Sequence, residues 1–441
     1  MPNTGTLPNV LLILADDHGY GDVSVHGGPH LQTPNMDRIA ASGAHFTRFY
    51  ANSSVCSPSR AALMTGRYPD RVGVPGVIRT HGDDNWGYFS QDAVTMPSML
   101  ARAGYATSLV GKWHLGLEPE NHPCRRGFDS FNGFLGDMMD DYYTHLRHGH
   151  NYMRQAHQQI DPRGHATDLF TGWAVEQIRQ WPQAEAPQFL YLAYNAPHTP
   201  IQPPEEWVER VRRREPGITD ERLHYVALVE HLDAGIGRVL DALEQTGELD
   251  NTLVVYTSDN GGQLDVGACN GPLRGAKGDM YEGGIRVPAC AMWPGHIPAG
   301  LETDQVALLS DLLPTVCEIA GVDVDHRIDG CSILPTLLGR DQDLSDRVVY
   351  WLRREGTARF LGLCQHAVRR GDLKLLHNDP FSPLELYDLG ADPKETADLA
   401  GADADAFRQM TGVLQREMHE AGAMPWQKPG TRPQGLTHEC G

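Results

Sequence analysis

Oxygen-bearing side chains follow two apolar runs of this 441-residue sequence. Asp16 and Asp17 come directly after the first run, and Asp259 and Asn260 follow the second run after one intervening residue. Ligands of open α/β sheets gather at the carboxyl ends of the strands, so these four side chains are candidates for a single site. Three carboxylates and an amide, with no Cys or His among them, suit Ca²⁺ or Mg²⁺ and suit structural Zn²⁺ poorly. The alternative is that Asp-Asp and Asp-Asn-Gly-Gly only form turns, as these residue types often do.

Cys56 lies at the predicted start of a helix. Pro58 falls in the first turn of this helix, and Gly66 is its expected C′ residue. The free N–H groups and the macrodipole of a helix N-terminus stabilise an anion, either a thiolate or a bound oxyanion. Arg60 follows one turn later, close enough to face that anion. A lone Cys before a helix is more often an ordinary small residue, so the interpretation of Cys56 depends on the string around it.

Strand-like and helical segments alternate over most of the chain. Continuous apolar runs, which suit strands buried on both faces of a parallel sheet, occupy residues 10–15, 188–195 and 252–257. The second and third runs each follow a predicted helix, at residues 167–181 and 220–245. This alternation predicts crossover connections and an open α/β sheet. Shorter helices are predicted at residues 34–42 and 97–103.

The pattern changes near residue 348. Short strand-like segments are predicted at residues 348–351, 367–376 and 384–389, and an amphipathic helix at residues 404–421. We therefore expect two domains, an α/β domain over residues 1–340 and a smaller α+β domain over residues 341–441. The tail from Met424 onward is rich in Pro and Gly and is expected to be irregular.

The composition excludes some classes of partner. The formal charge is −20, from 37 Lys plus Arg against 57 Asp plus Glu, and such a surface repels nucleic acid. The longest apolar run near the start is far shorter than the roughly 20 residues that span a bilayer, so we expect no membrane span.

The same segment lacks the basic and apolar regions of a secretory signal, and the eight cysteines are scattered, as is typical of mostly free thiols in a reducing compartment. We expect a cytoplasmic protein. A chain that lacked its natural start would look the same, and the protein would then be periplasmic or secreted.

The string that begins at Cys56 fits the pattern Cys-x-Pro-Ser-Arg-x-x-x-x-Thr-Gly, and with it the sequence resembles the type I, formylglycine-dependent sulfatases of the alkaline phosphatase superfamily. Further motifs follow in the family's order, at residues 15–22, 111–116, 196–198, 258–262, 273–278 and 281–284. The resemblance covers most of the chain. It implies a large mixed, mostly parallel sheet sandwiched by helices, with a smaller C-terminal α+β domain.

The resemblance also implies a nucleophile and a metal site. A maturation enzyme would oxidise Cys56 to Cα-formylglycine, whose hydrated aldehyde attacks sulfur. Residue 56 and the side chains of Asp16, Asp17, Asp259 and Asn260 would hold Ca²⁺, with Mg²⁺ the less favoured ion. A second hydroxyl on the hydrate lets sulfate leave and the aldehyde return, whereas an ordinary Ser would remain a stable sulfate ester.

The resemblance assigns roles to the basic residues as well. Arg60 would steady the hydrate, and Lys112 and His198 would contact the sulfate. Lys277 would bridge the sulfate and the leaving oxygen, and His114 would serve as the base. Either His198 or Lys277 donates the leaving-group proton.

Formal charges in this pocket sum to about +2, because Ca²⁺ with Arg60, Lys112 and Lys277 outweighs the three Asp carboxylates. Such a pocket in an acidic shell predicts selective capture of small sulfated ligands. Two further residues of the 273–284 motifs, Arg274 and Glu282, are expected to pair with each other and support the Lys277 loop.

A polar, aromatic stretch between residues 137 and 157 is where a substrate loop would be built. Its Asp-Tyr-Tyr-Thr-His string most resembles the arylsulfatase B, or N-acetylgalactosamine-4-sulfatase, branch. A sulfated sugar is the substrate that this resemblance implies, with His145 and Arg147 as candidate sugar contacts. The alternative is a solvated connection without contact to substrate.

Two other functions stay open at this point. One is a phosphonate monoester or phosphodiester hydrolase of the same superfamily, which shares the formylglycine and the metal. The other is an inactive binding protein that holds Ca²⁺ while Cys56 remains a thiol.

Overall fold

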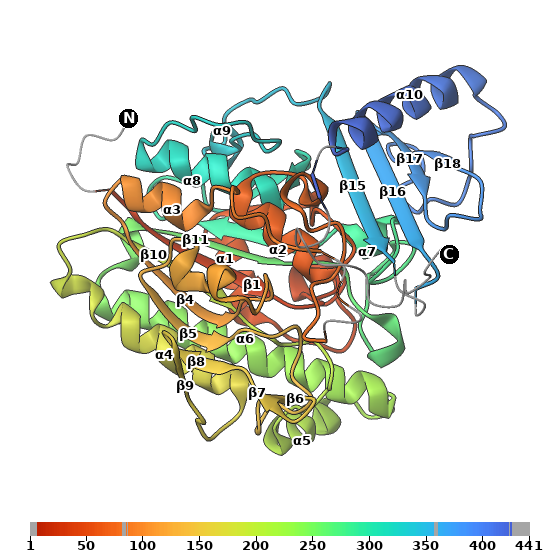
Figure 1. The fold of residues 1–441 in the computed structure, drawn as a ribbon. Coiled ribbons are helices and arrows are strands. Elements are labelled where there is room, and N and C mark those ends of the chain that lie inside the picture. Colours follow the sequence, from red (N-terminus) through yellow and green to blue (C-terminus); the bar gives the residue numbers. More distant parts are fainter. Residues whose placement is uncertain (1–6, 82–84, 86, 357–359, 423, 426–441) are drawn as a thin grey trace, which may run out of the picture.

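A ten-stranded mixed sheet runs through the larger part of the molecule (Figure 1). The computed structural model describes residues 7–81, 85, 87–356, 360–422 and 424–425, and the strand order is β13-β2-β12-β11-β1-β10-β4-β5-β8-β9. Its five central strands, from β11 to β5, are all parallel. They are β11 (Thr252–Ser258), β1 (Asn9–Ala15), β10 (Gln188–Ala193), β4 (Ala106–Lys112) and β5 (Ser130–Phe134).

Outer strands, joined to the central ones by antiparallel pairing, complete the sheet at both sides. The strand β12 pairs with β11, and β8 pairs with β5, each in the antiparallel sense. The outer strands are β2 (Ala44–Phe46), β12 (Ala289–Met292), β13 (Leu301–Thr303), β8 (Met153–Gln155) and β9 (Gln158–Gln159). The mixed, mostly parallel sheet expected from the sequence is confirmed.

Both faces of the central strands are buried. In β1, Leu11 and Ile13 pack into one apolar cluster, while Leu12 and Leu14 pack into another on the opposite face. The first cluster includes residues of α1 (Pro34–Ala41), α4 (Ala166–Ile178) and α6 (Asp220–Thr246). The second includes residues of α2 (Cys56–Thr65), α3 (Met96–Arg102) and α8 (Leu312–Ala320). Because side chains alternate between the faces of a strand, a strand between two helical layers must be apolar throughout.

The C-terminal part forms a second, four-stranded antiparallel sheet of β15 (Val348–Glu355), β16 (Leu363–Arg370), β17 (Leu373–His377) and β18 (Glu385–Asp388). One face of this sheet packs on Tyr50, Met280, Ile285 and Leu308 of the larger part. The helix α10 (Ala404–Glu420) covers the other face (Figure 1). The expected smaller α+β unit is therefore present.

The predicted elements agree with the structure except at one hairpin. The segment 367–376, expected to be a single strand, comprises the end of β16 and most of β17, with a turn at Gly371 between them. The backbone of Gly371 has φ of 59°, which glycine adopts without strain, so the chain reverses there. The domain boundary expected between residues 340 and 341 falls between α9 (Leu334–Leu337) and β15 and stays a prediction.

The described helices include none that is both long and apolar enough to cross a bilayer. The seven cysteines of the described ranges are all free, and Cys440 lies outside those ranges, as does most of the tail from Met424.

Candidate active site

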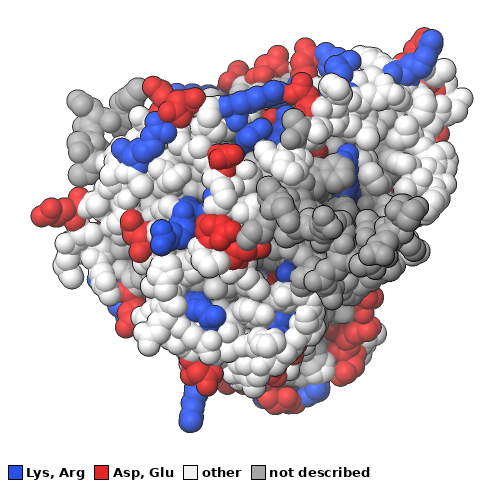
Figure 2. Space-filling view, viewed as in Figure 1, with Lys and Arg blue, Asp and Glu red and all other residues white. Residues whose placement is uncertain are grey.

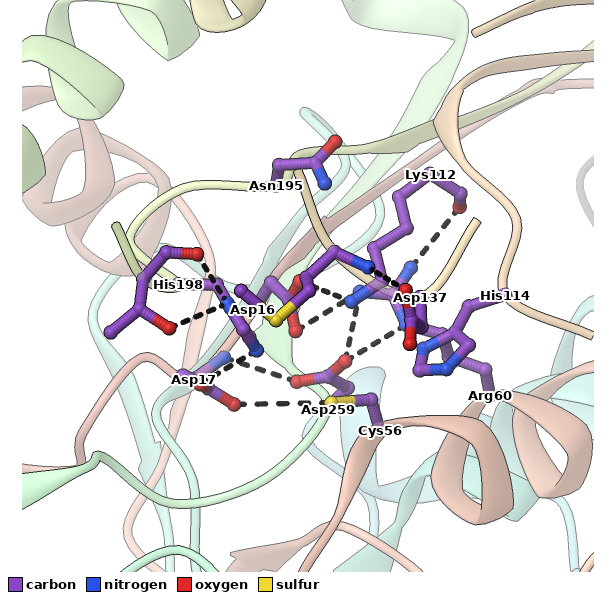
Figure 3. Close-up of polar contacts among 12 residues, drawn as sticks. Asp16, Asp17, Cys56, Arg60, Lys112, His114, Asp137, Asn195, His198 and Asp259 are labelled. Carbon is purple, nitrogen blue, oxygen red and sulfur yellow. Dashed lines mark hydrogen bonds and ion pairs between the residues drawn. The ribbon is translucent and has the colours of Figure 1, made fainter. Parts of the chain in front are cut away.

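The carboxyl ends of four parallel strands bring the predicted site residues together. Ala15 of β1 is paired in register with Ser258 of β11, so Asp16 and Asp17 lie level with Asp259 and Asn260. The strand β4 ends at Lys112, and the loop after β10 contains His198. Figure 3 shows these side chains converging from separate segments around residue 56. The sheet edge expected from the sequence is thus the place where they meet.

Cys56 is the first residue of α2 and points its thiol at this edge. It is buried, and its Sγ lies 4.0 Å from Oδ1 of Asp17 (Figure 3). Burial raises the pKa of the Cys56 thiol well above its usual value, and the positive charge of Lys112 only partly opposes this. An unmodified Cys56 is therefore a neutral thiol rather than the thiolate that a helix N-terminus alone would favour.

Arg60 holds the metal-site carboxylates in place. Its Nε donates to Oδ2 of Asp259 at 2.8 Å, and its Nη1 donates to the carbonyl oxygen of Lys112 at 3.1 Å. Its Nη2 also lies 3.6 Å from Oδ1 of Asp16. All three charged side chains are fully buried, so each depends on the others for compensation.

Two lysines pair with the remaining carboxylate oxygens. Lys112 Nζ donates to Oδ2 of Asp16 at 2.5 Å, and Lys277 Nζ donates to Oδ2 of Asp17 at 2.5 Å. Burial alone would raise the pKa of Asp16, but Lys112 and its positive neighbours hold that pKa well below its usual range. Burial, followed by the charge of Asp16, raises the pKa of Asp259 to about 7. Asp259 is therefore less well compensated by the basic side chains than Asp16 is.

Two oxygens at this edge suit a bound cation. Oδ1 of Asp16 and Oδ1 of Asn260 are buried and make no hydrogen bond within the described residues. Asn260 turns its Nδ2 toward Oδ1 of Asp17 at 2.8 Å, which fixes the orientation of its amide and leaves the oxygen free to bind a cation. Ligand atoms of Asp16, Asp17, Cys56 and His198 also lie within 4.8 Å of one another. Carboxylate and amide oxygens that lack hydrogen-bond donors are suitable ligands for a hard divalent cation.

His198 is fixed by its neighbours. Its Nδ1 lies 2.7 Å from the carbonyl oxygen of Thr199, which can only accept, so Nδ1 bears the proton. Its Nε2 then accepts from Lys277 Nζ at 3.1 Å. Burial and the positive charge of Lys277 lower the pKa of His198. In this pair Lys277 is the protonated partner.

His114 has a free basic nitrogen. Its Nε2 donates to the carbonyl oxygen of Ile78 at 2.8 Å, and its buried Nδ1 has no partner in the described part of the chain. Burial and the charge of Lys112 lower the pKa of His114 well below its usual value, so the ring is neutral. The residue has φ of 61°, a conformation that is uncommon for non-glycine residues and recurs at functional sites.

The two sugar-contact candidates are placed differently. His145 is fully buried, and its Nε2 donates to the carbonyl oxygen of Gly164 at 3.0 Å. Arg147 is partly exposed, with its Nε bonded to Asp137 at 3.0 Å and its Nη1 to Asp140 at 2.7 Å. Sugar contact by either residue stays a prediction, and the exposure favours Arg147.

Tyr142 was not identified from the sequence as a site residue. Its side chain is buried, and its phenol O–H lies 2.8 Å from the carbonyl oxygens of both Asn195 and His198. The residue thus fixes the loop that presents His198. The sequence gives no signal that separates it from its exposed neighbour Tyr143, since both lie in one Asp-Asp-Tyr-Tyr string.

Contacts with the C-terminal domain support the Lys277 loop. Arg274 and Glu282, expected to pair with each other, do not form an ion pair. Arg274 donates to the Tyr387 hydroxyl at 2.9 Å, and Glu282 accepts from Lys374 at 2.9 Å. The expectation was wrong because the buried carboxylate of Glu282 faces the second sheet, where Lys374 is the nearest buried cation.

Comparisons with known proteins agree with this geometry. A family model described as Sulfatase matches residues 8–322, and one described as N-sulphoglucosamine sulphohydrolase, C-terminal, matches residues 276–423. N-acetylgalactosamine-6-sulfatase of Homo sapiens is 33% identical over 95% of this chain and 87% of that protein. Arylsulfatase A of Homo sapiens is 34% identical over 93% of this chain and 86% of that protein.

A solved structure gives the same result. The crystal structure of Ps i-CgsB in complex with k-i-k-neocarrahexaose is 33% identical, with a TM-score of 0.87 over 98% of this chain and 96% of that one. The fold and the site are those of an alkaline phosphatase-like hydrolase of sulfuric esters. The chain belongs to the sulfatase family, as the Cys56 string predicted. The likeness to the arylsulfatase B branch in particular stays a prediction.

We expect Tyr142→Phe to lower aryl sulfate turnover by about tenfold, because two buried carbonyl groups lose their donor and the His198 loop loosens. Tyr143→Phe is the matched control, because Tyr143 is 47% exposed and is expected to change turnover by less than about twofold. Steady-state kinetics on p-nitrophenyl sulfate measures both. Equal effects of the two substitutions would contradict a positioning role for Tyr142.

Proposed function

We propose that this protein hydrolyses sulfate monoesters of a carbohydrate, and also aryl sulfates, with a nucleophile made from Cys56 and with Ca²⁺ at the strand ends. The main support is the position of Cys56 at a helix N-terminus, directly beside the carboxylate of Asp17 and the cluster of basic side chains. The relatives named N-acetylgalactosamine-6-sulfatase and the neocarrahexaose complex support a sugar as the group that bears the sulfate.

The neutral thiol of Cys56 supports conversion to formylglycine by a maturation enzyme. A buried, protonated thiol is a weak nucleophile toward an anionic sulfate, whereas an aldehyde hydrate offers one hydroxyl for attack and a second for release. The Nδ1 lone pair of His114 is unpartnered within the described residues, and it accepts the proton of the second hydroxyl so that sulfate is expelled.

Lys277 is the proton donor that we favour for the leaving alcohol. Its ammonium faces Nε2 of His198, and the bond from His198 to Thr199 leaves that nitrogen as an acceptor. The proton between the two residues is therefore held at Lys277 Nζ. His198 orients this ammonium through the lone pair of its Nε2.

Asp16, Asp17, Asp259 and Asn260 would hold a Ca²⁺, which would supply Lewis-acid polarisation of the attacking oxygen and positive charge near the sulfuryl oxygens. Arg60 orients the carboxylate of Asp259. The site's three carboxylates and three basic side chains are neutral in sum, so the ion makes the pocket attractive to an anionic ester.

Sulfate specificity distinguishes this function from a phosphonate monoester or phosphodiester hydrolase. We expect kcat/KM for p-nitrophenyl sulfate to exceed that for p-nitrophenyl phenylphosphonate and bis(p-nitrophenyl) phosphate by about a hundredfold, equivalent to ~2.7 kcal/mol of transition-state stabilisation. Parallel assays under one condition measure the ratio. A ratio below one would favour the rival hydrolase, and no turnover of any ester would favour a binding protein.

Residue 56 should be an aldehyde in protein produced with a formylglycine-generating enzyme. Peptide mass spectrometry over residue 56 tests this, and Cys56→Ala should abolish turnover because neither thiol nor aldehyde remains. Cys331→Ala is the matched control, since Cys331 is a free, partly buried cysteine outside the site. A uniformly unmodified thiol after co-expression, or activity retained in Cys56→Ala, would refute this nucleophile.

Ca²⁺ should stabilise the fold. At a free concentration a hundred times its Kd, we expect it to raise the free energy of unfolding by about 2.7 kcal/mol, since it binds only the folded chain. Denaturant unfolding in Ca²⁺ and in EGTA measures this. Asp16→Asn should lose most of the effect, and Asp265→Asn, at an exposed position beyond the end of β11, should keep it. An equal effect in both variants, or a larger one from Mg²⁺, would contradict the assignment.

A further inference from the structure

The strand β15 of the C-terminal domain lies against the loop that leads to Cys56. Trp351 Nε1 donates to the carbonyl oxygen of Ala51 at 2.7 Å, and Ser53 Oγ donates to the carbonyl oxygen of Leu352 at 2.8 Å. The next residue of β15 is Arg353. The second domain therefore places Arg353 next to residues 51–53, which lie just before the start of α2.

A second loop of the active site contacts the backbone of β15 directly after Arg353. The amide of Arg354 donates to the carbonyl oxygen of Pro75 at 2.8 Å. This loop continues to Ile78, whose carbonyl oxygen accepts from His114. Arg353 thus lies on β15 between the segment that leads to the nucleophile and the segment that orients the base.

The Lys277 loop provides a third contact. Arg353 Nη1 donates to the carbonyl oxygen of Gly278 at 3.3 Å. A Cβ at position 278 would lie only 2.8 Å from this Nη1, and Gly278 has φ of 98°, which residues other than glycine rarely adopt. Because Gly278 follows Lys277 directly, this contact places the guanidinium beside the backbone of the loop that presents Lys277.

The guanidinium of Arg353 is incompletely compensated. Its Nε donates to Oε1 of buried Glu355 at 3.3 Å, but Arg79 takes both oxygens of that carboxylate, at 2.7 and 3.2 Å. Across the described residues, Nη2 of Arg353 has no hydrogen-bond partner, although the side chain is only 14% exposed. Burial lowers the pKa of Arg353, with the carboxylate of Glu355 opposing it. An anion bound at Nη2 would supply the negative charge that Glu355, which also pairs with Arg79, does not fully provide.

The surrounding surface makes such a contact selective. Figure 2 shows Lys and Arg interspersed with Asp and Glu on the visible face rather than gathered in one basic field. With a net charge of −20, long-range attraction does not concentrate polyanions on this protein. Recognition of a charged substrate must then come from fixed groups at the pocket.

We propose that Arg353 binds a second anionic group of the substrate, a sulfate or a carboxylate placed a few bonds from the ester that is cleaved. This inference rests on the proposed sulfatase function and deepens it. The preferred substrate is then a saccharide with at least two anionic groups, one in the sulfate pocket and one at Arg353. The C-terminal domain thereby takes part in the choice of substrate.

Non-hydrolysable sulfonates test this without knowledge of the sugar. Isothermal titration calorimetry on the full chain would compare ethanesulfonate with ethane-1,2-, propane-1,3- and butane-1,4-disulfonate. The tightest disulfonate should bind at least about tenfold better than the monosulfonate, beyond the twofold advantage of having two identical ends, since a charge-assisted bond to arginine is added. In Arg353→Met the ratio should fall to about twofold, and Arg353→Lys should restore part of it because the charge returns without the planar fork.

Arg370→Met is the matched control. Arg370 pairs in register with Val348, at the opposite end of β15, and forms an exposed ion pair with Asp346. It should keep the wild-type ratio, and thermal unfolding should show all variants to be folded. A wild-type ratio of twofold or less would overturn the inference. An unchanged ratio in Arg353→Met would overturn it as well, and so would the absence of binding by both probes. Because binding is measured without turnover, failure of the proposed sulfatase function would appear separately, in the aryl sulfate assay.

Discussion

Mutual compensation of buried charges at the carboxyl edge of the sheet is the constraint on which the site depends. Three carboxylates, one guanidinium and two ammonium groups meet there, most of them removed from water. A buried charge without a partner costs several kcal/mol, so no member of the set is independent of the others. Parallel strands make the arrangement possible, because β1 and β11 end in register and present Asp16 beside Asp259.

This constraint also explains why a cation belongs at the strand ends. The basic side chains satisfy Oδ2 of Asp16 and Oδ2 of Asp17, yet Oδ1 of Asp16 and Oδ1 of Asn260 are left without a donor in the described structure. A divalent ion would satisfy both oxygens and change a neutral cluster into one that attracts an anionic ester. Binding of metal and binding of substrate then have a single electrostatic origin.

The smaller domain contacts two segments of the active site and holds them in place. The Lys277 loop is tied to it by Arg274 with Tyr387 and by Glu282 with Lys374. The strand β15 is tied to the segment before Cys56 through Ser53. These contacts connect parts of the chain far apart in sequence, so catalytic and C-terminal domains are expected to be stable only together.

The sequence by itself determined the central strands, the start and end of the Cys56 helix, and the residues that converge on it. Strands buried on both faces must be apolar throughout, and the carboxyl ends of parallel strands in an open sheet meet at one edge. The apolar runs at residues 10–15 and 252–257 therefore indicated where Asp16 and Asp259 would lie. The hairpin at Gly371 was missed because apolar residues flank the turn on both sides, so the pattern predicted one segment although Arg370, Gly371 and Asp372 interrupt the apolar residues.

Only the tertiary structure decided which partner each charged or polar group receives. Tyr142 and Tyr143 are adjacent and chemically identical, yet only Tyr142 is buried against the His198 loop. Arg274 and Glu282 lie within one motif region but bind different residues of the second sheet. The physical reason is that local sequence fixes backbone conformation and patterning, whereas hydrogen-bond and ion pairing depends on distances between segments that only the packing of both domains sets.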